Sequence, residues 1–254
     1  MRIAITREIS PAITQCQLTH QARVAIDVDS ARAQHNDYEQ CLVSAGCTVE
    51  RLQTTSDLPD SVFVEDIAVV VAELAVVTRP GAEPRRRETP AVAEALGKHR
   101  TLQYIRAPAT LDGGDVLVMG RRVFVGRSGR TNAEGVDQLR QILIVCGYTV
   151  QAVPVDGCLH LKSAVTAVSD DAVLINRRWV PVDAFSGLAL LDVHPGEPWG
   201  ANALRIADDI IYPTAFPETR ARLEARGFQV RTVDVGELAK AEGAVTCCSL
   251  IFAA

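Results

Sequence analysis

Several features of membrane and secreted proteins are missing from this sequence. No segment approaches the ~18 uninterrupted apolar residues that a membrane-spanning helix needs, and the charged start MRIAITREIS does not resemble a signal peptide. There is no C-x-x-C pair. The seven cysteines are odd in number and lie mainly within apolar stretches, which is typical of reduced thiols in a core. We therefore expect a cytoplasmic protein with no membrane partner.

The sequence is also short of positive charge. Its net charge is −5, and the lone basic run from Arg85 to Arg87 is offset by Glu83 and Glu88. Such a chain offers no electrostatic footprint for nucleic acid, which favours a small-molecule partner. With 254 residues, 48% of them apolar, the chain can bury a large core, and we expect one domain spanning residues 1–254. The sequence leaves the oligomeric state open, with a homodimer among the candidates.

What the chain does contain is a repeating order of elements. A short polar cluster precedes a strand, a tight turn, a second strand, a helix and a third strand. The polar clusters of four copies open at Glu65 with Asp66, at Asp112 in the stretch LDGGD, at His160 and at Asn202. This order predicts ββαβ units repeated along the chain.

A fifth copy is divided between the two ends of the chain. Residues 244–252 supply strand material, and the N-terminus supplies RIAIT, a helix near residues 29–45 and the extended CTVERLQ. The equivalent positions recur after 46, 48, 42 and 45 residues, in the order Asp66, Asp112, His160, Asn202 and Cys247. The chain is therefore expected to close on itself.

Local signals mark two of the expected helices. In the first copy, Thr89 is expected as the N-cap, Pro90 at the first helical position and Gly97 just beyond the end. In the second copy, Thr131 and Glu134 have the spacing of a capping box.

Units of this length cannot each bury an apolar face alone, so they must pack against one another. Closing them radially also protects the edges of the sheets. We therefore predict an α/β fold in which five ββαβ units form a five-fold pseudo-symmetric α/β-propeller. The alternative is an open α/β sheet, in which the polar clusters would scatter. In the ring, the first residues of equivalent strands converge at the axis, namely Glu65, Asp66, Asp112, His160, Asn202 and Cys247.

This set contains a thiol, an imidazole and several carboxylates, which suit nucleophilic catalysis on a cationic substrate. Cys247 lies in an expected strand, VTCCSLIF, where a buried cysteine is commonly just a small hydrophobe. Because side chains alternate across a strand, Cys247 and Cys248 should face opposite sides, and the sequence does not choose between them. His160 has the alternative of a half-buried imidazole without a catalytic role, and no metal-ligand spacing surrounds it.

The charged residues also have two interpretations each. Asp112 precedes two glycines, which allow close approach of a ligand but also favour a simple turn. Glu65 and Asp66 head an apolar strand, where adjacent acids are costly unless they are solvated, protonated or paired with a cation. Arg85 and Arg130 are either surface charges or a fork for the carboxylate of an amino acid.

Taken together, five stretches in order resemble the dimethylarginine dimethylaminohydrolases, in the guanidino-modifying branch of the five-fold α/β-propeller (pentein) superfamily. They cover nearly the whole chain: LPDSVFVEDIAVV with TRPGAEPRRRE, TLDGGDVLVMGRRVFVGRSGRTNAEG, LHLKS, GANAL and GAVTCCSLIF. The resemblance implies Cys247 as nucleophile, His160 as general acid and base, and Asp112 as the carboxylate that orients His160. The substrate-binding residues that it implies are Leu18 and Asp60 lining the pocket, Glu65 and Asp66 at the guanidinium or the amine, Arg85 and Arg130 at the α-carboxylate, and a backbone carbonyl near Ala241 at the amino group.

The implied activity is hydrolysis of an N-omega-methylated arginine, asymmetric dimethylarginine or monomethylarginine, to citrulline and the methylated amine. Cys247 would add to the guanidinium carbon and His160 would protonate the departing amine, leaving a covalent thiouronium that water hydrolyses. Nearby carboxylates raise the pKa of a thiol and a bound cation lowers it, so substrate is expected to promote ionisation of Cys247. The reaction requires no metal and no cofactor, although a thiol beside a histidine can bind zinc adventitiously.

This chain departs from its apparent relatives at several positions. Animal members carry Val and Asp where it has Ala241 and Glu242, and the lid region around Leu18 aligns poorly. Arginine deiminases place an acid two residues after the catalytic histidine, where this chain has Lys162, and this favours a methylated substrate over arginine. The alternatives are an arginine deiminase, an amidinotransferase of the same superfamily, and a non-catalytic five-fold binding ring.

Overall fold

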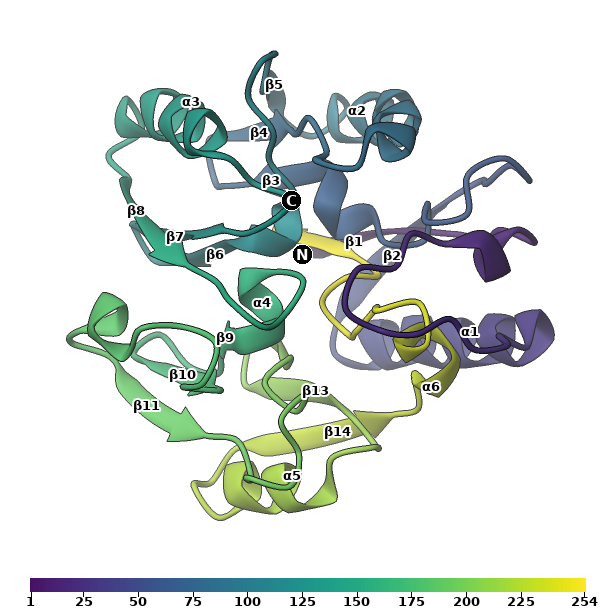
Figure 1. Cartoon of the computed structure of the whole chain (residues 1–254), viewed down its shortest axis with the longest axis vertical. Coiled ribbons are helices and arrows are strands. Elements are labelled where there is room, and N and C mark those ends of the chain that lie inside the picture. Colours follow the sequence, from purple (N-terminus) through teal and green to yellow (C-terminus); the bar gives the residue numbers. More distant parts are fainter.

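Five three-stranded sheets stand around a common axis in the computed structural model, which describes residues 1–254 (Figure 1). In every sheet a central strand pairs antiparallel with one neighbour and parallel with the other. The predicted five-fold α/β ring is therefore confirmed. In chain order the sheets contain β3 (Ala68–Val70), β4 (Leu74–Val77) and β5 (Thr101–Tyr104); β6 (Val116–Met119), β7 (Arg122–Arg127) and β8 (Thr149–Pro154); β9 (Val165–Ala167), β10 (Ala172–Ile175) and β11 (Ala189–Asp192); β12 (Leu204–Ile206), β13 (Asp209–Pro213) and β14 (Gln229–Val233); and β15 (Leu250–Ala253), β1 (Arg2–Arg7) and β2 (Cys47–Leu52).

The two ends of the chain complete the fifth sheet. β1 lies in its middle, antiparallel to β15 with Arg2 opposite Ala253, and parallel to β2 with Arg2 opposite Cys47. Both termini lie near the centre of the ring in Figure 1. The C-terminal strand therefore closes the ring, as the divided fifth copy predicts.

A helical segment at the rim connects the two parallel strands of each sheet, because parallel strands need a long crossover (Figure 1). In α3, the side chains of Val136, Leu139 and Leu143 are buried on one face. None of the helices is both long enough and apolar enough to pass through a bilayer. The rim segments are α1 (Val28–Ser44), α2 (Thr89–Leu96), α3 (Ala133–Ile144), the short 3-10 helix η5 (Val182–Phe185) and α5 (Pro217–Glu224).

Two predicted helix starts are wrong by one residue. Thr89 is the first residue of α2 and not its N-cap, because the 3-10 helix η3 (Glu83–Glu88) runs directly into α2. The capping box of Thr131 and Glu134 is also not formed. Asn132 caps α3 instead, since its side chain accepts a hydrogen bond from a backbone N–H of the first turn.

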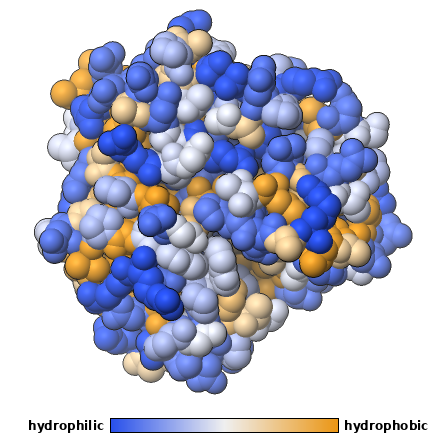
Figure 2. All heavy atoms as spheres, viewed as in Figure 1, coloured by the Kyte–Doolittle hydropathy of each residue, from blue (hydrophilic) through white to orange (hydrophobic).

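The hydrophobic core consists of five clusters, each lying between two neighbouring sheets. In one of them Val76 of β4 packs in the same cluster as Val125 of β7, and in the next Phe124 of β7 shares a cluster with Val173 of β10. No sheet buries its apolar face alone, which is the physical reason for the ring. Hydrophilic residues cover most of the rim of the face in Figure 2, with apolar patches between them.

The polar clusters lie in turns just before the first strand of each sheet, and three of them are on or next to a short helical turn. These helical turns are η2 (Val64–Ile67), η4 (Gly113–Asp115) and α4 (Leu161–Ala164). First strands of neighbouring sheets contact one another, as β15 does β3 and β6 does β9. The prediction that Cys247 lies within a strand is wrong. β15 starts only at Leu250, opposite Ile5 of β1, and Cys247 is in the turn before it.

Candidate active site

A small cavity of about 20 Å³ lies where these turns meet. Seven of the ten predicted site residues line it, and Asp112 lies behind His160. Leu18 and Glu65 are not among the lining residues. The full lining is Gln17, Asp60, Phe63, Asp66, Arg85, Arg130, Leu159, His160, Ala241, Glu242, Gly243 and Cys247.

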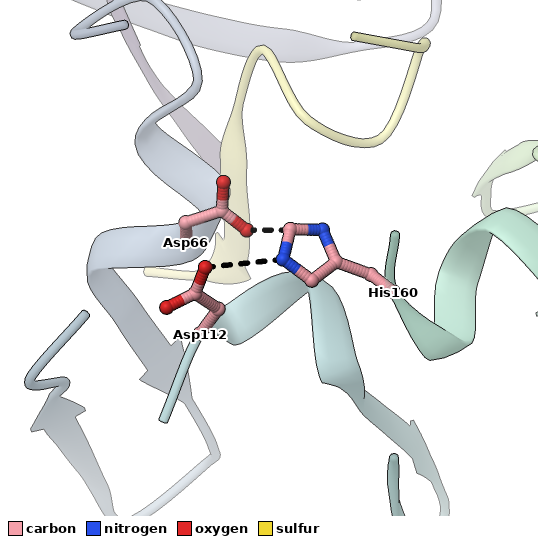
Figure 3. Close-up of side chains that lie close together, drawn as sticks. All are labelled: Asp66, Asp112 and His160. Carbon is pink, nitrogen blue, oxygen red and sulfur yellow. Dashed lines mark hydrogen bonds and ion pairs between the residues drawn. The ribbon is translucent and has the colours of Figure 1, made fainter. Parts of the chain in front are cut away.

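His160 stands between two carboxylates that reach it from two other sheets (Figure 3). Its Nε2 lies 3.1 Å from Oδ2 of Asp112, and its Nδ1 lies 3.8 Å from Oδ1 of Asp66. Asp112 is completely buried, and its Oδ1 accepts a hydrogen bond from the backbone N–H of Gly81. Asp112 is therefore in hydrogen-bond contact with the imidazole, as a carboxylate that orients His160 would be.

The same carboxylates favour the protonated form of His160. Burial acts to lower its pKa, but the charge of Asp66, the hydrogen bond to Asp112 and the charge of Asp115 together raise it to about 9. Reciprocally, His160 and Arg85 hold the pKa of Asp66 below its usual range against the effect of burial. The surroundings of His160 therefore favour its imidazolium form at neutral pH, in which it can donate a proton.

The second glycine of LDGGD is required by this close packing. A Cβ atom at Gly114 would come within 2.6 Å of Nδ1 of His160 and 2.7 Å of Oδ1 of Asp66. The backbone N–H of Gly114 also donates to the same oxygen of Asp66, at 3.0 Å. The DGG sequence forms a short helical turn, and its second glycine allows the side chains of His160 and Asp66 to approach the backbone closely.

Arg85 is buried, and most of its hydrogen-bond donors already have partners within the protein. Its Nη1 pairs with Asp66, its Nε and Nη2 donate to Glu88, and its Nη2 also donates to the carbonyl of Phe63 at 2.9 Å. Each of its three nitrogens therefore already has an acceptor. Arg85 lines the cavity with few donors left for a two-arginine fork, and its carboxylate partners are Glu88 and Asp66.

Glu65 does not reach the cavity as the resemblance implies. Its Oε1 lies 2.5 Å from Nζ of Lys162, and its Oε2 accepts a hydrogen bond from the hydroxyl of Thr246 at 2.8 Å. Both acidic side chains of the pair are buried, but Glu65 lies on the side of a separate groove that also contains Lys162 and Thr246. Lys162 therefore neutralises Glu65, which leaves Asp66 as the carboxylate of the pair that lines the cavity.

The two adjacent cysteines have different environments although they do not lie in a strand. Cys247 is half-buried and lines the cavity, whereas Cys248 is fully buried in the hydrophobic cluster beside α1. Burial raises the pKa of the Cys247 thiol well above its usual range, and the charges of Glu65 and Asp66 raise it further. Cys247 is therefore the cysteine that a ligand in the cavity can meet, and its surroundings favour the protonated thiol.

The outer part of the cavity contains groups suited to the two ends of an amino acid. Arg130 contributes a guanidinium, and the carboxylate of Asp60 accepts a hydrogen bond from the backbone N–H of Gln17 at 3.0 Å. The predicted pocket residue Leu18 instead packs against the hydrophobic cluster that contains Cys248, and its neighbour Gln17 takes its place in the lining.

Asp115 is a residue of the site that the sequence reasoning missed. It is fully buried, and it accepts hydrogen bonds from the backbone N–H of Leu161 at 2.9 Å and from the hydroxyls of Ser128 and Thr131, both at 2.6 Å. Burial raises its pKa to about 6. Asp115 therefore ties the turn that carries His160 to the loop that carries Arg130. The sequence feature that could have identified Asp115 is an acidic residue directly before an apolar strand, which is the same feature that drew attention to Asp66.

Asp66, Asp112 and His160 also form the one group of side chains with the spacing of a metal site, with their ligand atoms within 4.8 Å of one another. Their hydrogen bonding favours a proton over a metal ion. Asp66 is paired with Arg85, and both carboxylates face an imidazole whose pKa they raise, whereas a metal requires that imidazole to be neutral.

A closed ring of five small α/β sheets with a cysteine, a histidine and carboxylates at its axis defines the guanidino-modifying branch of the pentein enzymes. A family model described as "N,N dimethylarginine dimethylhydrolase, eukaryotic" matches residues 6–183. A dimethylarginine dimethylaminohydrolase from Streptomyces coelicolor is 39% identical over 97% of this chain and 95% of its own length. The chain belongs to the dimethylarginine dimethylaminohydrolase family.

Two solved structures of this family are also similar to the chain. One is a cysteine-to-serine variant from Pseudomonas aeruginosa in complex with citrulline, with a TM-score of 0.93 and 31% identity over 98% of both chains. The other is a histidine-to-glycine variant in an adduct with S-methyl-L-thiocitrulline, with a TM-score of 0.93 and 30% identity over 99% of this chain and all of that one. Both relatives hold a small amino-acid ligand.

Proposed function

We propose that this protein hydrolyses N-omega-methylated L-arginine to citrulline and the methylated amine, with Cys247 as nucleophile. The observation that carries the proposal is the arrangement around one cavity of a thiol, a doubly paired imidazolium and groups of both charges. Relatives that bind citrulline and S-methyl-L-thiocitrulline support this substrate class.

The geometry supports one orientation of the substrate. Arg130 suits the α-carboxylate, while Asp60 and the backbone carbonyl of Ala241 suit the α-amino group. The guanidinium group then extends toward Asp66, beside Cys247 and His160. This assignment places the guanidinium of the substrate beside Asp66 and its amino group beside Asp60.

The first half of the reaction forms a covalent bond to sulfur. A bound guanidinium cation offsets the negative field of Asp66, which promotes loss of the Cys247 proton to solvent, and the thiolate adds to the guanidinium carbon. His160, protonated at rest, gives its proton to the nitrogen that carries the methyl groups. The C–N bond breaks, the methylated amine departs, and a thiouronium remains on Cys247.

The second half consumes water. His160 is now neutral and accepts a proton from a water molecule as its oxygen adds to the thiouronium carbon. The C–S bond then breaks and citrulline is released. The sulfur leaves as a thiolate and recovers a proton, so that thiol and imidazolium are both restored. Asp112 keeps the ring of His160 in one orientation through both halves.

Contacts of Lys162 bear on the choice between methylated arginine and arginine. Its ammonium group pairs with Glu65 behind the cavity, so neither of these residues is available to hold the far nitrogens of an unmethylated guanidinium. Only Asp66 remains there. This supports a substrate whose far nitrogen carries methyl groups rather than two additional hydrogen bonds.

Three further properties belong to the same proposal. The ring closure by β1 and β15 supports a single domain over residues 1–254, since neither end could leave without opening the ring. The seven free cysteines support a reducing, cytoplasmic location. A homodimer stays a prediction, which sedimentation of the purified protein tests.

The activity is tested by offering asymmetric dimethylarginine, monomethylarginine and arginine separately and measuring citrulline and released amine. We expect turnover of the methylated substrates by the wild type and none by Cys247→Ser. Cys146→Ser, which alters a half-buried cysteine outside the cavity, is the matched control and should retain activity. Turnover of arginine alone would overturn the substrate, and full activity of Cys247→Ser would overturn the nucleophile.

A further inference from the structure

One segment over the cavity has no regular structure of its own. Residues 16–27 join the 3-10 helix η1 (Ile13–Gln15) to α1, and most of their side chains are exposed. In Figure 1 this dark purple segment runs beside the yellow loop that follows α6 (Gly236–Ala239). Because the segment has no strand or helix partner, its position depends on a few side-chain contacts. We call residues 17–21 the lid segment.

Glu242 makes the largest set of these contacts. Its Oε1 accepts hydrogen bonds from the backbone N–H groups of Thr19, His20 and Gln21, at 3.1, 2.5 and 2.6 Å, and its Oε2 accepts a second bond from Thr19 at 3.0 Å. Three successive N–H groups around one carboxylate form an anion-binding nest. Such charge-assisted bonds are stronger than neutral ones. The lid segment is thus folded around a side chain from a residue more than two hundred positions away.

The backbone at Glu242 adopts a conformation that is unfavourable for a residue with a side chain. Its φ is 59°, in the left-handed region. It stands at the end of α6, where its N–H donates to the carbonyl of Ala239 and the N–H of Gly243 donates to Leu238, each at 3.0 Å. This is the Schellman arrangement, whose left-handed position is usually a glycine. A glutamate there is costly, and strain of this kind is concentrated at functional positions.

The other two polar attachments of the lid segment involve expected substrate contacts. The carboxylate of Asp60 accepts from the N–H of Gln17, and Nη2 of Arg130 donates to the hydroxyl of Thr19 at 2.9 Å. A substrate that uses Asp60 for its amino group and Arg130 for its carboxylate competes for both groups. Of the three attachments, only the one through Glu242 uses no side chain that the substrate is expected to bind.

We propose that Glu242 is a positioning residue that holds the lid segment over the cavity while Asp60 and Arg130 bind the substrate. This rests on the proposed function for the identity of the substrate, but not for the contact itself. Glu242 acts on the reaction through the lid: it keeps the amino-acid end of the substrate covered and takes no part in the steps at sulfur or nitrogen.

Three variants separate this role from a structural one. Glu242→Gly removes the carboxylate and also relieves the left-handed strain, so that its melting temperature should equal or exceed that of the wild type. Glu242→Gln keeps an acceptor but not the charge, and Glu242→Asp keeps the charge on a shorter side chain. Glu224→Gln, whose side chain is exposed on α5, is the matched control.

The first measurement is hydrogen exchange of residues 19–21 in the protein without substrate. We expect exchange at least about tenfold faster in Glu242→Gly, intermediate rates in the Gln and Asp variants, and no change in Glu224→Gln. Because this measurement needs no turnover, it stands even if the proposed substrate is wrong. Unchanged exchange in Glu242→Gly would overturn the proposal.

Steady-state kinetics with asymmetric dimethylarginine form the second measurement. The loss of a contact that covers the bound substrate should raise KM about tenfold and leave kcat within about twofold, with partial rescue in Glu242→Asp. A fall in kcat at unchanged KM would place Glu242 in the chemistry and overturn the positioning role. Failure of every methylated substrate with the wild type would overturn the proposed function and leave the exchange result intact.

Discussion

Glu65 and Asp66 are adjacent in the chain, yet their carboxylates meet different cations. Oε1 of Glu65 lies 2.5 Å from Nζ of Lys162, behind the cavity. Asp66 pairs with the buried Arg85 and lies 3.8 Å from Nδ1 of His160. Two neighbouring acids that looked equivalent in the sequence thus have separate tasks, one in the ion pair behind the cavity and one at its lining.

Lys162→Met should leave Glu65 buried without a cation and lower the free energy of unfolding by about 3 kcal/mol at neutral pH. Burial already raises the pKa of Glu65 against the lowering effect of Lys162, and loss of the lysine raises it further. An acid whose pKa is higher in the folded protein stabilises fully below its unfolded pKa and loses that stability as the pH rises through the folded pKa. The loss in free energy of unfolding relative to the wild type, measured by urea unfolding, should therefore be larger at about pH 8 than at about pH 5.

A double variant provides the control for this prediction. Adding Glu65→Gln to Lys162→Met removes the uncompensated charge and keeps an acceptor for the hydroxyl of Thr246. The double variant should recover most of the lost stability. A deficit independent of pH, or a double variant as unstable as the single one, would show that this ion pair is not the origin of the effect.

Asp112→Asn should slow turnover about a hundredfold, because Asp112 both orients His160 and stabilises its proton. The pKa of His160 is about 9, so the proton-donating form is lost as the pH rises through this value. Removing the charge of Asp112 lowers that pKa, and the descending limb of the pH–kcat profile should move toward neutral pH. Asp137→Asn, on the exposed face of α3, should change neither. A descending limb that stays in place in Asp112→Asn would contradict the assignment.

The sequence predicts the ring because the same order of strands and helix recurs five times along the chain. Val76, Val125 and Val173 each belong to a strand that is too short to form a core alone, and each is buried in a cluster shared with a neighbouring sheet. This constraint acts on every unit, so a regular period in the chain implies a closed set of sheets. Asp66, Asp112 and His160 then converge because they occupy equivalent positions in successive units of the ring.

The sequence could not predict which side chains pair with one another, because the pairs join residues that are far apart in the chain. Glu65 and Lys162 are 97 residues apart, and only the closed ring shows that they pair. Thr131 and Asn132 are both good helix caps, and the choice falls on Asn132 because buried Asp115 binds the hydroxyl of Thr131. Cys247 lies outside the strand because β1 offers partners only as far as Leu250.

Ionisation of Cys247 should require a bound cation. Burial and the charges of Glu65 and Asp66 raise the pKa of this thiol, so the empty enzyme should show no thiolate at neutral pH. The thiolate is measured as the difference in ultraviolet absorbance between the wild type and Cys247→Ser across a pH titration. Adding arginine as a guanidinium-bearing ligand should lower the apparent pKa. A fully ionised Cys247 at neutral pH in the empty enzyme would refute substrate-promoted ionisation.

Gly114→Ala should abolish activity through the geometry of His160. The new Cβ atom would lie 2.6 Å from Nδ1 of His160 and 2.7 Å from Oδ1 of Asp66, and neither group has room to retreat because both are buried. We expect kcat to fall at least about a hundredfold, since an imidazole displaced by even ~1 Å loses its alignment for proton transfer. Gly129→Ala is the matched control in a neighbouring loop, because a Cβ there meets nothing within 4 Å. Equal activity of the two variants would mean that the contact between residue 114 and His160 does not constrain the reaction.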